Sequence, residues 1–196
     1  MLTPPSFETA RLSYRAVDKT ADVALFNEMW SDPATQFGGM GSACAPWGPG
    51  KTGEFLKAVA DAPLSIVGYL IKENPDDKEV PVGWMCLKTP YPGSPHRNAM
   101  LGVSMMPGQQ GKGYGKEMLE FALEIGFLRM GLNRIECECF AWNEPAIRLY
   151  KQAGFVEEGR KRRSLFQEGE FRDELILGLL VEDWRASHED KLQPNK

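Results

Sequence analysis

The sequence has too few histidine and cysteine residues for a metal centre of the usual kinds. It contains two histidines and four cysteines among 196 residues, and no Cys-x-x-Cys pair is present. A structural zinc site draws its four ligands mainly from these residue types, commonly at that spacing. Metal chemistry is therefore not the leading interpretation. The cysteines are predicted to be reduced residues of the core, at Cys44, Cys86, Cys137 and Cys139.

Long apolar runs and an excess of basic residues are also missing. No run of about 18 apolar residues is present, which argues against a helix that spans a membrane. The net charge is -4, so no chain-wide positive field collects the phosphates of a nucleic acid. We therefore expect neither a nucleic-acid nor a membrane partner. The first residues lack the basic and apolar segments of a secretory signal, so a cytoplasmic location is the default expectation.

The length of 196 residues is typical of a single domain with one core. We expect this domain to cover residues 8–185. It would follow an N-terminal extension over residues 1–7 and precede a polar, flexible tail over residues 186–196.

Apolar patterns predict an α/β fold for that domain. Apolar residues at helical spacing predict helices over 19–30, 54–60, 111–130 and 144–153. Apolar and β-branched runs predict strands over 11–17, 64–71, 80–88, 99–106, 134–140, 155–166 and 171–180. Residues 32–53 are rich in glycine and proline, which is typical of a long loop.

The order of these elements predicts one parallel strand pair. The strand at 99–106 is followed by a glycine-rich turn, the helix at 111–130 and the strand at 134–140. A strand, helix and strand in this order form a crossover, which joins parallel neighbours. We expect the remaining strand pairings to be antiparallel.

The turn of this crossover carries the most informative stretch of the chain, Gln110-Gly111-Lys112-Gly113-Tyr114-Gly115-Lys116. A helix N-terminus leaves its first N–H groups unpaired and carries about half a positive charge. Glycines there remove the side chains that would block a phosphate, and the two lysines add positive charge. The stretch therefore predicts a pyrophosphate site.

Two other phosphate-binding patterns fit the sequence less well. A dinucleotide-binding fingerprint requires a third glycine where Lys116 stands. The stretch 45–52 ends in Gly-Lys-Thr like a P-loop, but Ala45 replaces its first glycine. Pro46 and Pro49 also remove N–H donors that a phosphate cradle needs.

A second motif follows the glycine-rich turn about thirty residues later, Asn143-Glu-Pro-Ala-Ile-Arg-Leu-Tyr150-Lys-Gln-Ala-Gly154-Phe155. This ordered pair of motifs resembles the GNAT superfamily of acyl-CoA N-acyltransferases. Two further stretches, Thr9-Ala-Arg11-Leu12-Ser-Tyr-Arg15 and Gly154-Phe155-Val-Glu-Glu-Gly159, resemble its branch of ribosomal-protein N-terminal acetyltransferases. The resemblance covers residues 8–184. It implies a mixed, mostly antiparallel twisted sheet with helices on both faces and a central parallel strand pair that splays apart to hold CoA.

The resemblance also implies acetyl-CoA as the acyl donor and a set of residues that bind it. The CoA pyrophosphate would be held by loop residues, with backbone N–H groups from Gln110, Gly111, Gly113, Gly115 and Lys116 and with Lys112 beside them. Val103 and Met105 would offer backbone groups to the pantetheine arm. Asn143 would contact the cofactor, and Tyr150 would lie near its sulfur.

Transfer to an amine needs a base, because only a neutral amine attacks a thioester. Removing the proton at pH 7 costs roughly 1 kcal/mol for an α-amino group and about 4–5 kcal/mol for a lysine-like amine. Glu138 lies five residues before Asn143, a spacing that matches the base of ribosomal-protein acetyltransferases. Glu136, on the same strand face, is the alternative, and either carboxylate would act directly or through a water.

Tyr150 is the candidate acid, since a phenol can protonate the departing thiolate. The alternative interpretation of Tyr150 is an ordinary core aromatic residue. No cysteine or serine carries the signature of a covalent acyl-enzyme, so direct transfer is predicted.

We therefore expect an N-acetyltransferase that moves an acetyl group from acetyl-CoA to a primary amine. The acceptor would be a small-molecule amine or a protein N-terminus, and a homodimer is compatible with the family. Three tryptophans, Trp30, Trp47 and Trp84, are candidates for lining the acceptor pocket. The alternative is a non-catalytic CoA-binding or regulatory protein with the same fold.

Overall fold

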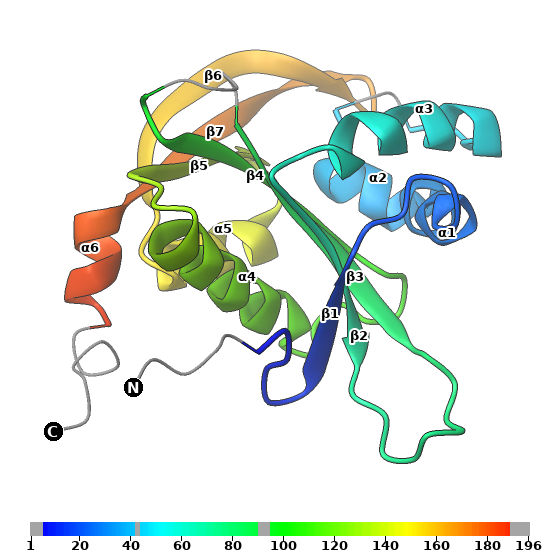
Figure 1. Ribbon diagram of the computed structural model, residues 1–196. Coiled ribbons are helices and arrows are strands. Elements are labelled where there is room, and N and C mark those ends of the chain that lie inside the picture. Colours follow the sequence, from blue (N-terminus) through cyan, green and yellow to red (C-terminus); the bar gives the residue numbers. More distant parts are fainter. Residues whose placement is uncertain (1–5, 42–43, 90–94, 189–196) are drawn as a thin grey trace, which may run out of the picture.

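A twisted sheet separates two layers of helices (Figure 1). The computed structural model describes residues 6–41, 44–89 and 95–188. Within them the seven strands lie in the order β1-β2-β3-β4-β5-β7-β6. Their bounds are β1 (Leu12–Ala16), β2 (Leu64–Leu70), β3 (Pro81–Lys88), β4 (Asn98–Met105), β5 (Arg134–Phe140), β6 (Val156–Gln167) and β7 (Glu170–Leu180). The predicted mixed α/β fold is confirmed.

Helices cover both faces of the sheet, as expected. The first layer holds α1 (Val23–Ser31), α2 (Pro33–Gly39) and α3 (Pro49–Ala60). The second layer, on the opposite side in Figure 1, holds α4 (Tyr114–Glu124), the π-helical turn η1 (Ile125–Arg129), α5 (Glu144–Gln152) and α6 (Val181–Ala186). We call these sides the α1 face and the α4 face. None of the helices in the described residues is long and apolar enough to cross a bilayer.

Among the described strands, β4 and β5 form the one parallel pair, and they separate soon after they meet. Their register runs from Asn98 opposite Arg134 to Met100 opposite Glu136. Both strands continue past this point, β4 to Met105 and β5 to Phe140. Beyond Met100, the edge of β4 that faces β5 therefore has no strand partner. This is the predicted splay.

Each face of the sheet has its own apolar cluster. On the α4 face, Met118, Leu119 and Ala122 of α4 are fully buried against the strands. On the α1 face, Trp30 packs edge-to-face on Trp84, with 5.7 Å between their ring centroids. Trp47 is 6% exposed and belongs to the same cluster. The three tryptophans considered for an acceptor pocket are therefore packed against one another in a core.

The prediction of a long loop over residues 32–53 was wrong, because these residues form α2 and the start of α3. Asp32 caps α2, where its side chain accepts a hydrogen bond of 2.8 Å from the backbone N–H of Thr35. Pro33 and Pro49 each occupy the first turn of a helix, a position that suits proline. High glycine and proline content concealed these local start signals.

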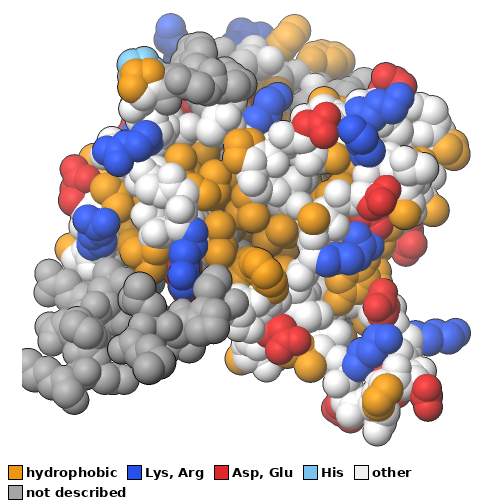
Figure 2. All heavy atoms as spheres, viewed as in Figure 1, with side chains coloured by type: hydrophobic (Ala, Val, Ile, Leu, Met, Phe, Trp, Pro, Cys, Tyr) orange, Lys and Arg blue, Asp and Glu red, His pale blue; other side chains and the backbone are white. Residues whose placement is uncertain are grey.

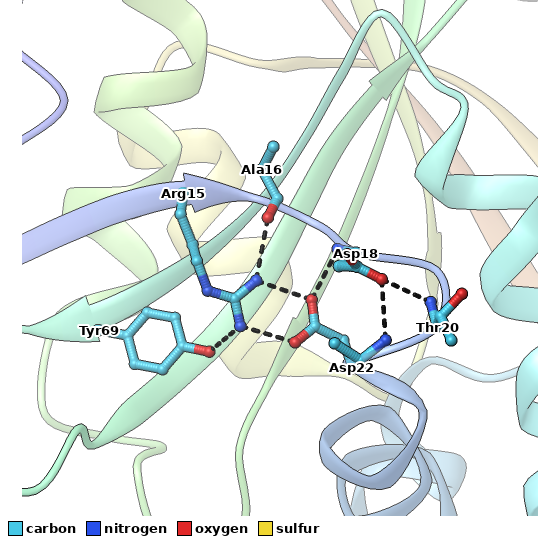
Figure 3. Close-up of polar contacts among 7 residues, drawn as sticks. Arg15, Ala16, Asp18, Thr20, Asp22 and Tyr69 are labelled. Carbon is cyan, nitrogen blue, oxygen red and sulfur yellow. Dashed lines mark hydrogen bonds and ion pairs between the residues drawn. The ribbon is translucent and has the colours of Figure 1, made fainter.

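The first helix begins later than the sequence pattern indicated. Asp18 accepts hydrogen bonds from the N–H groups of Thr20 and Ala21, which makes a turn of the residues before α1. Asp22 follows and is 4% exposed. Both of its carboxylate oxygens bind the Arg15 guanidinium, at 2.8 and 2.6 Å (Figure 3). This ion pair joins β1 to the start of α1.

Three further differences concern the second half of the chain and the cysteines. The long helix predicted over 111–130 is α4 followed by η1, and α6 was not predicted. Trp184 of α6 packs on Phe127 of η1, with 5.3 Å between the ring centroids. Cys86, Cys137 and Cys139 are buried and unpaired as expected, whereas Cys44 is exposed. Most of the proposed extension and tail, residues 1–5 and 189–196, lies outside the described residues.

Candidate active site

The loop between β4 and α4 depends on glycine at two of the predicted cofactor positions. Gly111 has a φ of +73°, and Gly113, which precedes the first residue of α4, has a φ of +83°. Residues other than glycine rarely adopt this left-handed backbone conformation. A Cβ atom added to Gly111 would have no neighbour within 4 Å, so the loop faces open space at that residue.

Five backbone N–H groups in this loop and the first turn of α4 have no acceptor among the described residues. They are the N–H groups of Gln110, Gly111, Gly113, Gly115 and Lys116. Several of them belong to the first turn of α4, where the helix contributes positive partial charge. This arrangement can bind an anion without moving the backbone.

Two lysine side chains add charge to the same loop. Lys112 Nζ donates to Gln109 Oε1 over 3.0 Å. Lys116 Nζ lies 3.8 Å from Glu120, and its side chain is 62% exposed. Neither ammonium group is buried by its contact, so both remain accessible to a phosphate.

The end of β4, the first turn of α4 and the helix α5 converge beside the splay. A Cβ atom placed on Gly115 would lie 3.5 Å from Met105 Sδ and 3.7 Å from Leu149 of α5. Val103 and Met105 are partly buried against the core on the α4 face. Figure 2, viewed as Figure 1, shows hydrophobic side chains gathered over the middle of the molecule with charged ones around them. The surface there suits the uncharged arm of a cofactor.

Tyr150 of α5 lies on the α4 face, near the part of β5 that has left β4. Its side chain is 5% exposed and packs on Phe155, with 5.6 Å between ring centroids. The hydroxyl has no hydrogen-bond partner among the described residues. Burial, followed by the nearby Cys137 and Cys139, raises the pKa of Tyr150 well above its ordinary value.

Asn143 is engaged within the protein at both ends of its amide. Its Oδ1 atom accepts a hydrogen bond of 3.2 Å from Ala146 N and so caps α5. Its Nδ2 atom donates to Gly38 O over 2.6 Å, at the end of α2. The neighbouring Trp142 also binds the end of α2, because its indole N–H donates a hydrogen bond to Phe37 O over 2.9 Å. These bonds fix the end of α2 to the turn that follows β5.

The two candidate base residues have different surroundings on the α1 face. Glu136 occupies the last position where β5 pairs with β4, and its carboxylate lies 3.0 Å from Arg134. Glu138 lies two residues further on, beside the diverging strands, and its side chain is 39% exposed. It forms an ion pair with Lys161 of β6, which also lies 3.2 Å from Glu174. Glu138 and Tyr150 therefore lie on opposite faces of the sheet at the splay.

Sequence reasoning did not select the residues that surround these groups. Arg11, which precedes β1, contacts the loop and Glu117 of α4. Burial raises the pKa of the Glu117 carboxyl, but hydrogen bonds from Thr9 and Arg11 outweigh it and lower the pKa below its ordinary value. Lys161, which forms the ion pair with Glu138, was not selected either. The contacts of Arg11 with Glu117 and of Lys161 with Glu138 join residues far apart in the chain, so no local sequence pattern predicts them.

No group of histidine, cysteine, aspartate and glutamate side chains in the described residues is arranged to hold a metal ion. A cavity of about 700 Å³ lies elsewhere, between residues 6–11, α4 and α6. It shares only Gly113 and Lys116 with the predicted cofactor residues.

Comparison with known proteins finds similar sequences among N-acetyltransferases. A spermidine N(1)-acetyltransferase of Vibrio cholerae is 33% identical over 78 residues, 40% of this chain and 45% of that protein. An uncharacterised prophage-derived N-acetyltransferase of Bacillus subtilis is 32% identical over 79 residues, with the same two shares. The matched segments thus span less than half of these curated relatives.

Solved structures resemble nearly the whole chain. The crystal structure of the Vibrio cholerae spermidine N-acetyltransferase in complex with CoA and spermine has a TM-score of 0.74 at 20% identity. The superposition covers 90% of this chain and 99% of that one. A GNAT-family acetyltransferase from Bacillus anthracis has a TM-score of 0.72 at 23% identity, over 89% and 98% of the two chains. Residues 23–155, from α1 to the end of the α5 motif, match the Acetyltransferase (GNAT) family, and the chain belongs to that family.

Proposed function

We propose that this protein is an N-acetyltransferase that transfers the acetyl group of acetyl-CoA directly to a primary amine. The observation that carries the proposal is the set of backbone N–H groups that have no acceptor among the described residues, beside the splayed strands β4 and β5. The loop fits a pyrophosphate, because Gly111 faces open space and the lysines remain accessible. The exposed edge of β4 at Val103 and Met105 fits the amide-bearing pantetheine arm. Any contact by Asn143 would use its remaining amide hydrogen.

Bound acetyl-CoA supplies an activated acetyl thioester. The chain's own residues then handle two protons on opposite faces of the sheet. Glu138, on the α1 face, accepts a proton from the attacking amine, directly or through a water. Tyr150, on the α4 face, donates a proton to the departing thiolate. The placement of the base and the acid on opposite faces suits direct transfer. The amine approaches the carbonyl carbon from one side, and the thiolate leaves on another.

We infer that the acceptor is a small cationic amine. Two observations support this class, the net charge of -4 and the acetylation of spermidine implied by the name of the Vibrio cholerae relative. An acidic protein attracts cationic substrates at long range, an effect that salt weakens. A protein N-terminus is the alternative acceptor.

The four unpaired cysteines support a reducing compartment such as the cytoplasm. A homodimer stays a prediction.

The experiment that tests the donor site compares two glycine-to-glutamate variants at matched positions. Gly115 and Gly50 are each the second residue of a helix, α4 and α3. A first-turn glutamate favours either helix, so both variants should fold. Gly115→Glu adds a negative charge to the helix turn whose N–H groups would bind the pyrophosphate. We expect it to abolish the thermal stabilisation by CoA, whereas Gly50→Glu keeps it.

Release of free thiol from acetyl-CoA, measured with a panel of amines, separates the enzyme from a non-catalytic CoA-binding protein. We expect release with polyamines at rates well above those with peptide N-termini. Stabilisation by CoA without release for any amine would favour the binding protein. If CoA stabilised Gly115→Glu as strongly as the unmodified protein, the assignment of the phosphate site would be wrong.

A further inference from the structure

Arg11 connects the segment before β1 to the phosphate loop through several contacts. Its Nη1 atom donates to the carbonyl oxygen of Lys112 over 3.1 Å. Its Nε atom donates to Glu117 Oε2 over 2.8 Å, and its guanidinium stacks over the Tyr114 ring at 4.7 Å. A Cβ atom on Gly113 would lie 3.4 Å from Arg11 Nη2. One guanidinium therefore touches the loop and the first turn of α4 together.

The bond to the Lys112 carbonyl fixes the direction of one N–H group of the loop. In a planar trans peptide, the carbonyl of one residue and the N–H of the next point in opposite directions. Because the carbonyl of Lys112 points toward Arg11, the N–H of Gly113 points away from it. Glycine rotates freely, so a loop with Gly111 and Gly113 needs an external contact to hold this orientation.

The backbone of Arg11 is itself held from both sides. Its N–H donates to Glu117 Oε1 over 2.8 Å, and its carbonyl oxygen accepts from the N–H of Ile71 over 3.0 Å. The same Glu117 oxygen accepts from Thr9 Oγ1 over 2.6 Å. The side chain of Arg11 therefore extends from a fixed point on the sheet to the loop.

We propose that Arg11 is a positioning residue that holds the β4–α4 loop in the orientation that binds the cofactor pyrophosphate. The proposal rests on the proposed function, since it assumes that this loop binds acetyl-CoA. Arg11 acts through the Lys112–Gly113 peptide and through Glu117. It should therefore affect donor affinity and leave the chemical step unchanged.

Arg11→Met and Arg11→Lys are the test variants, with Arg15→Met as the matched control. Arg15 lies four residues away and also forms an ion pair, but with Asp22 at the start of α1 (Figure 3). Calorimetric titration with CoA should show a Kd raised about tenfold or more in Arg11→Met, the scale of a lost charged hydrogen bond. Arg11→Lys should show a smaller rise, because an ammonium lacks the planar fork that serves both partners. Arg15→Met should bind CoA like the unmodified protein.

A donor without the nucleotide separates positioning from a general structural role. In Arg11→Met, kcat at saturating acetyl-CoA should be unchanged, and kcat/KM should fall for acetyl-CoA and not for acetylpantetheine. An equal fall for both donors, or an unchanged Kd for CoA in Arg11→Met, would overturn the proposal. If Arg11→Met does not fold, Glu117→Gln replaces it, and an unchanged Kd there would count equally against the idea.

The proposed function and the role of Arg11 are refuted by different results of these experiments. Absence of CoA binding by the unmodified protein would refute the proposed function, and the role of Arg11 with it. Normal CoA binding by both the unmodified protein and the Arg11 variants would refute the role of Arg11 alone.

Discussion

Tyr150 combines a packed ring with a hydroxyl that has no hydrogen-bond partner among the described residues. Its pKa is raised above the ordinary value first by burial and then by the nearby Cys137 and Cys139. Burial raises the pKa of Cys139 to about 11, and that of Cys137 is raised further, so both thiols are neutral near pH 7. The phenol is protonated near pH 7 already at its ordinary pKa of about 10, and burial moves this pKa further from working pH. A group in this state can donate a proton to a thiolate that forms beside it.

We predict that Tyr150→Phe lowers kcat by about 10²-fold or more while the Kd for CoA stays nearly unchanged, the usual scale of general acid catalysis. Phenylalanine preserves the packing on Phe155, so the thermal midpoint should change little. Tyr69→Phe is the control, because its hydroxyl contacts Arg15 far from the splay. Steady-state kinetics of thiol release makes the measurement. An unchanged kcat in Tyr150→Phe would remove the hydroxyl from the mechanism.

Glu138 and Glu136 differ in one respect that decides between them as the base. Glu136 stands where β5 still pairs with β4, whereas Glu138 stands where the strands have parted. We predict that Glu138→Gln lowers kcat about 10²-fold, within the range of general base catalysis, and that Glu136→Gln changes it little. The same thiol-release assay compares the two variants. The opposite order would assign the base to Glu136, and two unaffected variants would exclude both carboxylates.

At the scale of elements, patterns confined to a short stretch of sequence were predictive. Pro145 and Asn143 at the start of α5, with Gly154 after its end, are local signals, and the structure uses them as such. The parallel pairing of β4 and β5 follows from the order of strand, helix and strand. The splay came from family resemblance, since no local pattern sets where two strands part.

Elements whose ends depend on distant contacts were not predictable in the same way. The π-helical turn η1 contains Gly126, where a Cβ atom would lie 2.9 Å from Ile135 and 3.0 Å from Leu87. That packing joins a helix to two strands and is invisible in the helix sequence. Arg11 and Glu117 are separated by 106 positions, so their contact with the loop was missed for the same reason. The site residues taken from motifs stay predictions until the variants are measured.

At the scale of the whole molecule, the two apolar clusters bury titratable groups on both faces of the sheet. Burial raises the pKa of Cys86, on the α1 face, to about 11. Cys139, on the α4 face, has a pKa raised to about 11 by burial and then by Glu174. Both folded-state pKa values exceed the ordinary thiol value of 9.0. The folded protein thus retains protons that the unfolded chain loses between about pH 9 and pH 11.

This difference makes the fold sensitive to alkali, and the sign follows from proton binding. The stabilisation is fully present below pH 9 and is lost as the pH rises through the folded-state pKa values, because the unfolded state then binds fewer protons. Each buried thiol should steepen the fall in the free energy of unfolding by up to about 1.4 kcal/mol per pH unit. Urea denaturation at a series of pH values, with a reducing agent present, measures the slope.

Cys86→Ala should give a shallower slope between pH 9 and pH 11 than the unmodified protein, although its smaller side chain lowers stability at pH 7. Cys44→Ala, at an exposed position, should keep the original slope, and equal slopes in all three proteins would show that buried thiols do not cause the loss.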